Sequence, residues 1–87
     1  MAKEKRKFSK ELIGKTIVSK TGKTFGRVSD LMFETRTGEL LAILLKNPTE
    51  YASKLELEKS KQNEIKIPFN SVIAIGDFVV IAEEDIL

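Results

Sequence analysis

The sequence predicts an all-β domain, a small six-stranded β-barrel. Three observations carry this prediction: short runs rich in apolar and β-branched residues, turn residues between those runs, and a close spacing of the turns along the chain. About six strands within about 75 residues are typical of a closed or nearly closed barrel. The predicted strands are residues 13–19, 24–34, 39–46, 64–68, 71–75 and 78–82.

Glycine and other turn-forming residues separate most of these strands. Residues 20–23 and 35–38 each contain a glycine, and we expect both segments to form tight turns. Gly76 and Asp77 separate the last two strands, and a glycine in the first central position predicts a type II′ hairpin turn. The residues to which we assign a turn or a bend are Gly14, Gly22, Gly26, Asp30, Gly38, Pro68, Gly76 and Asp77.

The second predicted strand changes the face on which its apolar residues fall. Phe25 and Leu31 lie at odd positions, whereas Val28 lies at an even position. Because successive side chains of a strand point to opposite faces, this change predicts a bulge or a sharp bend at residues 26–30. Aspartate is depleted in strands, so we expect Asp30 to accept backbone N–H groups at this bend rather than to bind a ligand.

The segment from residue 47 to residue 63 differs from the rest of the chain. Pro48 ends the preceding strand, and good helix formers follow it. Either Thr49 or Ser53 would serve as an N-cap. Two leucines in this segment are spaced by two residues, which is the strand period. We therefore predict a mobile loop with a helical turn between the third and fourth strands.

The composition argues against an enzyme. The 87 residues include no cysteine and no histidine, which excludes a disulfide framework, a thiolate nucleophile, an imidazole base and the zinc sites built on these residues. The adjacent Ser-Lys pairs at residues 9–10, 19–20 and 53–54 are poor candidates for a catalytic pair, because neighbouring residues of a strand point to opposite faces. The Gly-Lys-Thr of residues 22–24 lacks the upstream glycine and the following helix of a phosphate-binding loop. We predict no catalytic residue, no cofactor and no metal.

The charges are distributed unevenly along the chain. Residues 1–27 contain nine Lys and Arg against two acidic residues, whereas residues 28–87 contain six against eleven. We divide the chain into a disordered basic arm at residues 1–10, a barrel domain at 11–82 and an acidic tail at 83–87 that we expect to fray. An electrostatic role of the arm would rest on Lys3, Lys5, Arg6, Lys7 and Lys10.

The hydropathy pattern indicates a cytoplasmic protein. The longest uninterrupted apolar run is residues 40–45, far shorter than the ~20 residues that span a bilayer. No apolar segment follows the basic N-terminus, so the pattern is not that of a secretory signal. The chain contains only four Asn and Gln residues, which favours a thermophilic source.

The order of the motifs along residues 11–82 resembles the PRC-barrel family. Each motif is short, but six of them follow one another at the spacing of that family. The motifs are Leu12-Ile13-Gly14-Lys15-Thr16-Ile17, Thr21-Gly22, Phe25-Gly26-Arg27-Val28-Ser29-Asp30-Leu31, Gly38-Glu39-Leu40, Ile67-Pro68-Phe69-Asn70-Ser71-Val72 and Ile75-Gly76-Asp77-Phe78-Val79-Val80.

The resemblance implies a six-stranded barrel and a role in protein assembly. Members of the family occur in the photosynthetic reaction centre H subunit, in a bacterial ribosome-maturation factor and as small stand-alone archaeal proteins. This chain is similar to the stand-alone group, which includes dimeric adaptors of FtsZ-based cell division. Because fold alone does not fix function, the resemblance gives a candidate setting for the protein, the division ring.

Apolar residues on both faces of several strands predict that a second chain covers one face. A small barrel has only one interior, so the remaining apolar residues suit a homodimer or another protein partner. The expected core residues are Ile17, Val28, Leu41, Ile43, Val72 and Val79, and the expected interface residues are Leu40, Leu44, Ile73 and Val80. The alternative is an RNA- or ribosome-associated factor that binds nucleic acid through the basic arm, in a salt-dependent manner.

Overall fold

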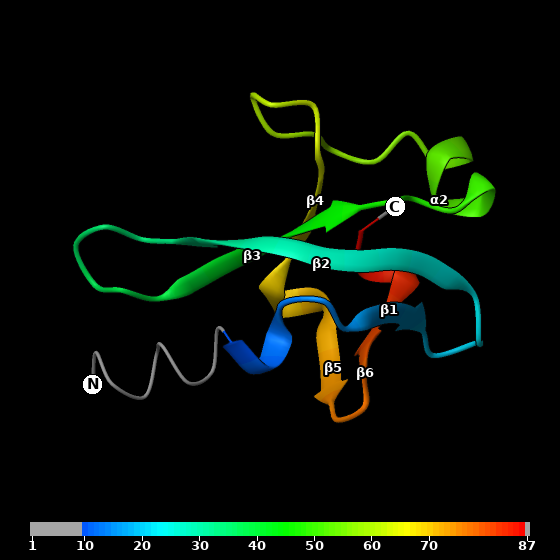
Figure 1. Ribbon diagram of the computed structural model, residues 1–87, viewed down its shortest axis with the longest axis horizontal. Coiled ribbons are helices and arrows are strands. Elements are labelled where there is room, and N and C mark those ends of the chain that lie inside the picture. The colour runs from blue at the N-terminus through cyan, green and yellow to red at the C-terminus, as the bar shows by residue number, and fades with distance from the viewer. Residues whose placement is uncertain (1–9, 87) are drawn as a thin grey trace.

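The computed structural model describes residues 10–86, which form one curled, six-stranded sheet with a short helix beside it (Figure 1). The strands follow the order β4-β3-β2-β1-β6-β5 across the sheet, and neighbours are antiparallel except for the parallel pair β1 and β6. Their bounds are β1 (Thr16–Ser19), β2 (Thr24–Phe33), β3 (Leu40–Lys46), β4 (Ile65–Pro68), β5 (Val72–Ile75) and β6 (Phe78–Ile81). The all-β prediction is confirmed. The two edge strands, β4 and β5, are consecutive in the chain, and the sheet stays open between them.

Each predicted strand is present, and the predicted helical turn is a short helix. Helix α2 (Glu50–Lys54) begins after Thr49, whose side-chain oxygen accepts a hydrogen bond from the Ala52 N–H. Of the two N-caps that the sequence offers, Thr49 is therefore the one used. A 3₁₀ turn, η1 (Phe69–Ser71), joins the two edge strands, and a second one, η2 (Glu83–Asp85), follows β6.

The long strand β2 contains the predicted irregularity. Its pairing with β3 skips Ser29, and its pairing with β1 skips Phe25, so each of these residues is the extra residue of a bulge. The bulges explain why apolar residues of β2 occupy both parities and still reach the core. Asp30 is exposed, and its Oδ1 accepts a hydrogen bond of 2.8 Å from the Leu31 N–H.

The prediction that Leu41 is a core residue is wrong. In the pairing of β2 with β3, Phe33 lies opposite Leu40 and Met32 lies opposite Ala42, so Leu41 is an extra residue. This bulge turns Leu41 outward, where 44% of it is exposed, and lets Leu40 pack against the core. The simple alternation that placed Leu41 inside does not hold across the bulge.

The type II′ prediction for the last hairpin is also wrong. Gly76 is absent from the residues with positive φ, which a type II′ turn requires in its first central position. Gly76 and Asp77 connect β5 to β6, and the last pair across the hairpin is Ile75 with Val79. The Gly-Asp pair therefore forms the connection, but without the backbone conformation of a type II′ turn.

The core fills the inside of the curled sheet and extends under α2. Its fully buried members include four of the expected core residues, Ile17, Val28, Ile43 and Val79. Val72, the remaining expected core residue, is half-buried and packs against them. Other buried members of the cluster are Leu12, Phe25, Leu45, Ala52, Leu57, Ile65, Ile67 and Ile81.

Candidate protein interface

The outer face of strands β1, β6 and β5 is mostly apolar, with Thr16 as a polar residue on β1. Ile17 on β1 and both Val79 and Ile81 on β6 point to the core. Because successive side chains of a strand alternate between its faces, Val18 on β1 and Val80 on β6 point outward. Val18 lies next to Val80, and Val80 lies opposite Ala74. Three neighbouring strands therefore present a row of aliphatic side chains on the face that turns away from the core.

Two larger apolar side chains adjoin this row. Phe78 is 52% exposed and has the same parity as Val80 on β6. Ile73 is 55% exposed and is the extra residue of a bulge in β5, since Val72 pairs with Ile81 and Ala74 with Val80. We call Val18, Ile73, Ala74, Phe78 and Val80 the outer apolar face.

The structure separates the four interface residues that the sequence singles out. Ile73 and Val80 both lie on the outer apolar face. Leu44 is only 7% exposed, and it lines a surface hollow with Met32 and with residues 59–62 of its own chain. Leu40 packs against the core cluster. We therefore leave Leu44 and Leu40 out of the proposed interface.

Sequence reasoning missed three members of the outer apolar face, Val18, Ala74 and Phe78. The signal was present for two of them, because Val18 alternates with core residues on β1 and Phe78 has the parity of Val80 on β6. No local signal identifies Ala74, since a bulge precedes it and the pairing with β6 determines its face.

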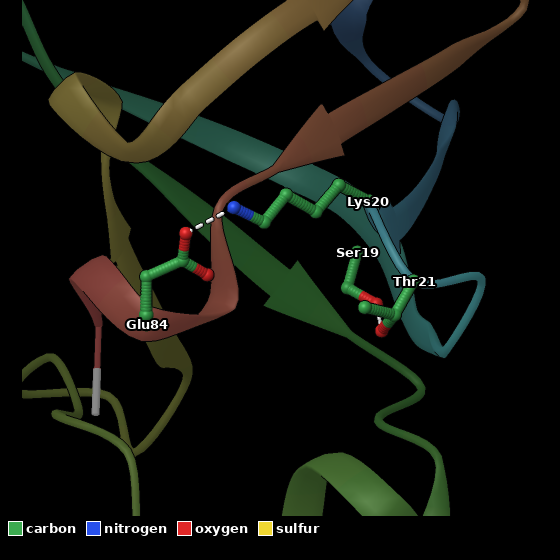
Figure 2. Close-up of polar contacts among 4 residues, drawn as sticks. All are labelled: Ser19, Lys20, Thr21 and Glu84. Carbon is green, nitrogen blue, oxygen red and sulfur yellow. Dashed lines mark hydrogen bonds and ion pairs between the residues drawn. The ribbon is translucent and has the colours of Figure 1, made fainter.

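Polar contacts fix the acidic segment to the body of the protein. Lys20, in the turn after β1, forms an ion pair with Glu84 of η2, as Figure 2 shows. The Tyr51 hydroxyl donates a hydrogen bond of 2.5 Å to Glu83 Oε2, so α2 also holds this segment. Residues 83–85 are thus part of the fold rather than a frayed end.

These contacts shift the pKa values of the groups involved. The hydrogen bond from Lys20 holds the pKa of the Glu84 carboxyl below its ordinary value, and the same contact raises the pKa of the Lys20 ammonium. The hydrogen bond to Glu83, with a smaller contribution from burial, raises the pKa of the Tyr51 phenol. Each pKa shift favours the form that takes part in the contact, which is the ionised Glu84 carboxylate, the protonated Lys20 ammonium and the neutral Tyr51 phenol.

The hydroxyl and carboxylate groups near this turn serve structural contacts. Ser19 is buried, and its Oγ lies 2.9 Å from Thr21 Oγ1 (Figure 2). The same Oγ accepts a hydrogen bond of 3.0 Å from the Lys23 N–H. Lys20 is engaged by Glu84, so the Ser19-Lys20 pair brings no free amine to the hydroxyl. Within residues 10–86, no group of three potential metal ligands occurs.

A pocket of about 600 Å³ lies between β3, α2 and the loop that precedes β4. Its lining combines aliphatic side chains, among them Leu45 and Leu57, with charged ones. Glu64, one of its carboxylates, accepts a hydrogen bond of 2.7 Å from the Ser29 hydroxyl. The Ser29 Oγ also lies 3.1 Å from Leu44 O, so these contacts join β2 to β3 and to the residue that precedes β4.

The basic arm falls largely outside the described residues. Lys3, Lys5, Arg6 and Lys7 lie outside them, and Lys10, at their start, is exposed. The part of the chain that the structure describes contains no helix that is long and apolar enough to cross a membrane.

Comparison with known proteins agrees with this geometry. The PRC-barrel domain matches residues 4–85, which include part of the predicted arm and most of the acidic segment. An uncharacterised protein of Methanocaldococcus jannaschii is 28% identical over 78 residues, which cover 90% of this chain and 83% of that protein. The match to the PRC-barrel domain covers nearly the whole chain, and the all-β fold is consistent with it. The chain belongs to the PRC-barrel family, whose domains are small protein-interaction modules.

Proposed function

We propose that the protein is a non-enzymatic adaptor that acts as a homodimer and binds other proteins through the outer apolar face. The single observation that supports this proposal best is the face itself, a row of aliphatic side chains with Phe78 and Ile73 beside it. Exposed apolar residues gathered over neighbouring strands mark interaction surfaces in soluble proteins. The groups that would carry chemistry are instead used in structural contacts.

The size of the chain favours a dimer as the functional unit. A domain of 87 residues buries only about 60–65% of the surface that its unfolded chain exposes. A second copy would cover apolar surface that a single copy leaves in water. Archaeal FtsZ-based cell division, the setting that the family resemblance suggests, is the setting that we propose for the adaptor.

Two measurements test the proposal. Light scattering at low micromolar concentration should give twice the chain mass of 9.8 kDa, and a clean monomer would refute the homodimer. Affinity purification from the native host should capture division-ring proteins. Capture of ribosomal particles in a salt-sensitive manner would instead favour the RNA-associated alternative.

A matched pair of variants tests the face. Phe78→Lys places a charge on the outer apolar face, whereas Phe33→Lys places one on the long β2–β3 hairpin, where Phe33 is 36% exposed. We expect Phe78→Lys to lose the captured partners and Phe33→Lys to keep them. Equal capture by both variants would contradict the assignment of the face, provided that circular dichroism shows both to be folded.

A further inference from the structure

The two edges of the sheet differ in how they are protected. Outside β4, Lys59 forms a bridge with Ile65, and the Lys66 N–H donates a hydrogen bond of 2.8 Å to Glu58 O. The strand also contains Lys66 and Pro68, and both residue types discourage the addition of another strand. The β4 edge is thus closed by its own chain and by its sequence.

The β5 edge has none of these protections. Its sequence, Val-Ile-Ala-Ile, contains no charge and no proline. The Val72 N–H bonds to Phe69 O at the end of η1; apart from this bond, no backbone hydrogen bond within residues 10–86 reaches β5 from an element other than β6. Ile73, Ala74 and Ile75 are all exposed. An uncharged, apolar edge with free backbone groups is a template for another strand.

The charges around β5 favour a second copy of the same strand. Asp77 lies beyond one end of β5, and at that end Lys15 Nζ donates a hydrogen bond of 2.5 Å to Gly76 O. The other end is preceded by Asn70 and Ser71, which are uncharged. If two β5 strands pair antiparallel, the charged end of each meets the uncharged end of the other. The pairing therefore brings no like charges together, and the two-fold symmetry closes the assembly at two copies.

We infer that the homodimer forms by antiparallel pairing of β5 with β5 of a second copy, so that the two sheets join into one. This inference rests on the homodimer proposed above and names the surface that forms it. Ile73 and Ala74 lie at the seam, whereas Val18 and Val80 lie on strands further from it. The outer apolar faces of the two copies then adjoin, and the dimer presents a wider apolar surface to a partner protein.

The absence of cysteine from the chain gives a direct test of the seam. A disulfide needs Cα atoms about 4.4–6.8 Å apart, which the middle residues of two paired antiparallel strands reach. We expect Ile73→Cys or Ala74→Cys to form a covalent dimer on mild oxidation. Leu41→Cys is the matched control, because Leu41 is also exposed (44%, against 55% for Ile73) and lies on β3, away from the seam. This variant should stay a monomer on denaturing gels.

A second pair of variants measures the same contact without a cross-link. Ile73→Lys puts at β5 the charge that protects natural edges, and Leu41→Lys puts the same charge elsewhere. Light scattering should give a monomer for Ile73→Lys and a dimer for Leu41→Lys, with both folded by circular dichroism. The inference requires both results, the cross-link and the loss of the dimer.

The outcomes separate this inference from the proposed function. If the unmodified protein is a monomer, the homodimer and the seam both fail. If the unmodified protein is a dimer but neither β5 cysteine cross-links, or Ile73→Lys stays dimeric, the seam is overturned while the homodimer stands.

Discussion

Replacing Gly26 by alanine should destabilise the fold strongly, because the backbone of β3 passes next to it. Gly26 has a φ of 152°, a conformation that residues with a side chain rarely adopt. An added Cβ would lie 2.8 Å from Leu45 Cδ1, 2.8 Å from Lys46 O and 3.1 Å from Asn47 O. The leucine methyl group can move aside, but the two oxygens belong to the main chain.

The neighbouring hydrogen bonds limit how far that main chain can move. Lys46 pairs with Arg27 across the sheet, and the Thr49 N–H donates a hydrogen bond of 2.9 Å to Phe25 O. We assign about 1–3 kcal/mol to the unfavourable backbone conformation and about 1–3 kcal/mol to the overlap. The alanine also lowers the conformational entropy of the unfolded chain, which offsets about 0.4–1 kcal/mol of this loss. Taken at the midpoints of their ranges, these contributions give an expected net loss in the free energy of unfolding of about 3 kcal/mol, and we use about 2–4 kcal/mol as the working range.

Thermal and urea denaturation followed by circular dichroism measure this loss. For a domain of this size, about 2–4 kcal/mol corresponds to a fall in Tm of about 10–30 °C. Gly76→Ala is the matched control, because its added Cβ would meet no atom within 4 Å and its φ is not positive. It should change the free energy of unfolding by no more than about 0.5 kcal/mol. If Gly26→Ala lost less than about 1 kcal/mol, the close approach of β2 and β3 would be refuted.

Three further predictions concern other parts of the fold. Glu56 has a φ of 53° just after α2, a conformation that glycine adopts more readily. Glu56→Gly should therefore raise the free energy of unfolding, measured by urea denaturation, by about 0.5–1 kcal/mol, and a decrease would contradict the assigned strain. Leu44→Ala should lower the free energy of unfolding by about 2–3 kcal/mol because Leu44 is buried, whereas Leu41→Ala should change it by no more than about 0.5 kcal/mol. Similar losses of stability in the two variants would refute the bulge at Leu41. The lowered pKa of Glu84 stabilises the fold above the pKa of the unfolded chain, and this contribution is lost as the pH falls through the folded pKa. The Tm of Glu84→Gln should therefore lie below that of the unmodified protein at neutral pH and converge with it as the pH falls through the lowered pKa of Glu84. A difference that stays constant with pH would show that the ion pair with Lys20 is not the cause.

The predicted interface shows where reasoning from the sequence stops. Strict alternation holds on β6, so the outward position of Val80 follows from the sequence alone. Alternation fails at Leu41, because a bulge there changes which residues face the core. Leu44 lies on the outward-facing side of β3, as the sequence predicts, but residues 59–62 of the same chain lie beside it. Only 7% of Leu44 is exposed, so it does not need a second copy of the chain to cover it.

The sequence by itself determined the number of strands and their positions along the chain, the bend in the second strand and the lack of cysteine and histidine chemistry. These properties depend on residue type and on neighbours a few positions away. The tertiary structure alone decided which apolar residues remain uncovered. Bulges arise from the pairing of distant strands, and cover for Leu44 comes from a loop that begins about 15 residues later in the chain. For the same reason the contrast between the closed β4 edge and the free β5 edge became visible only in the folded sheet.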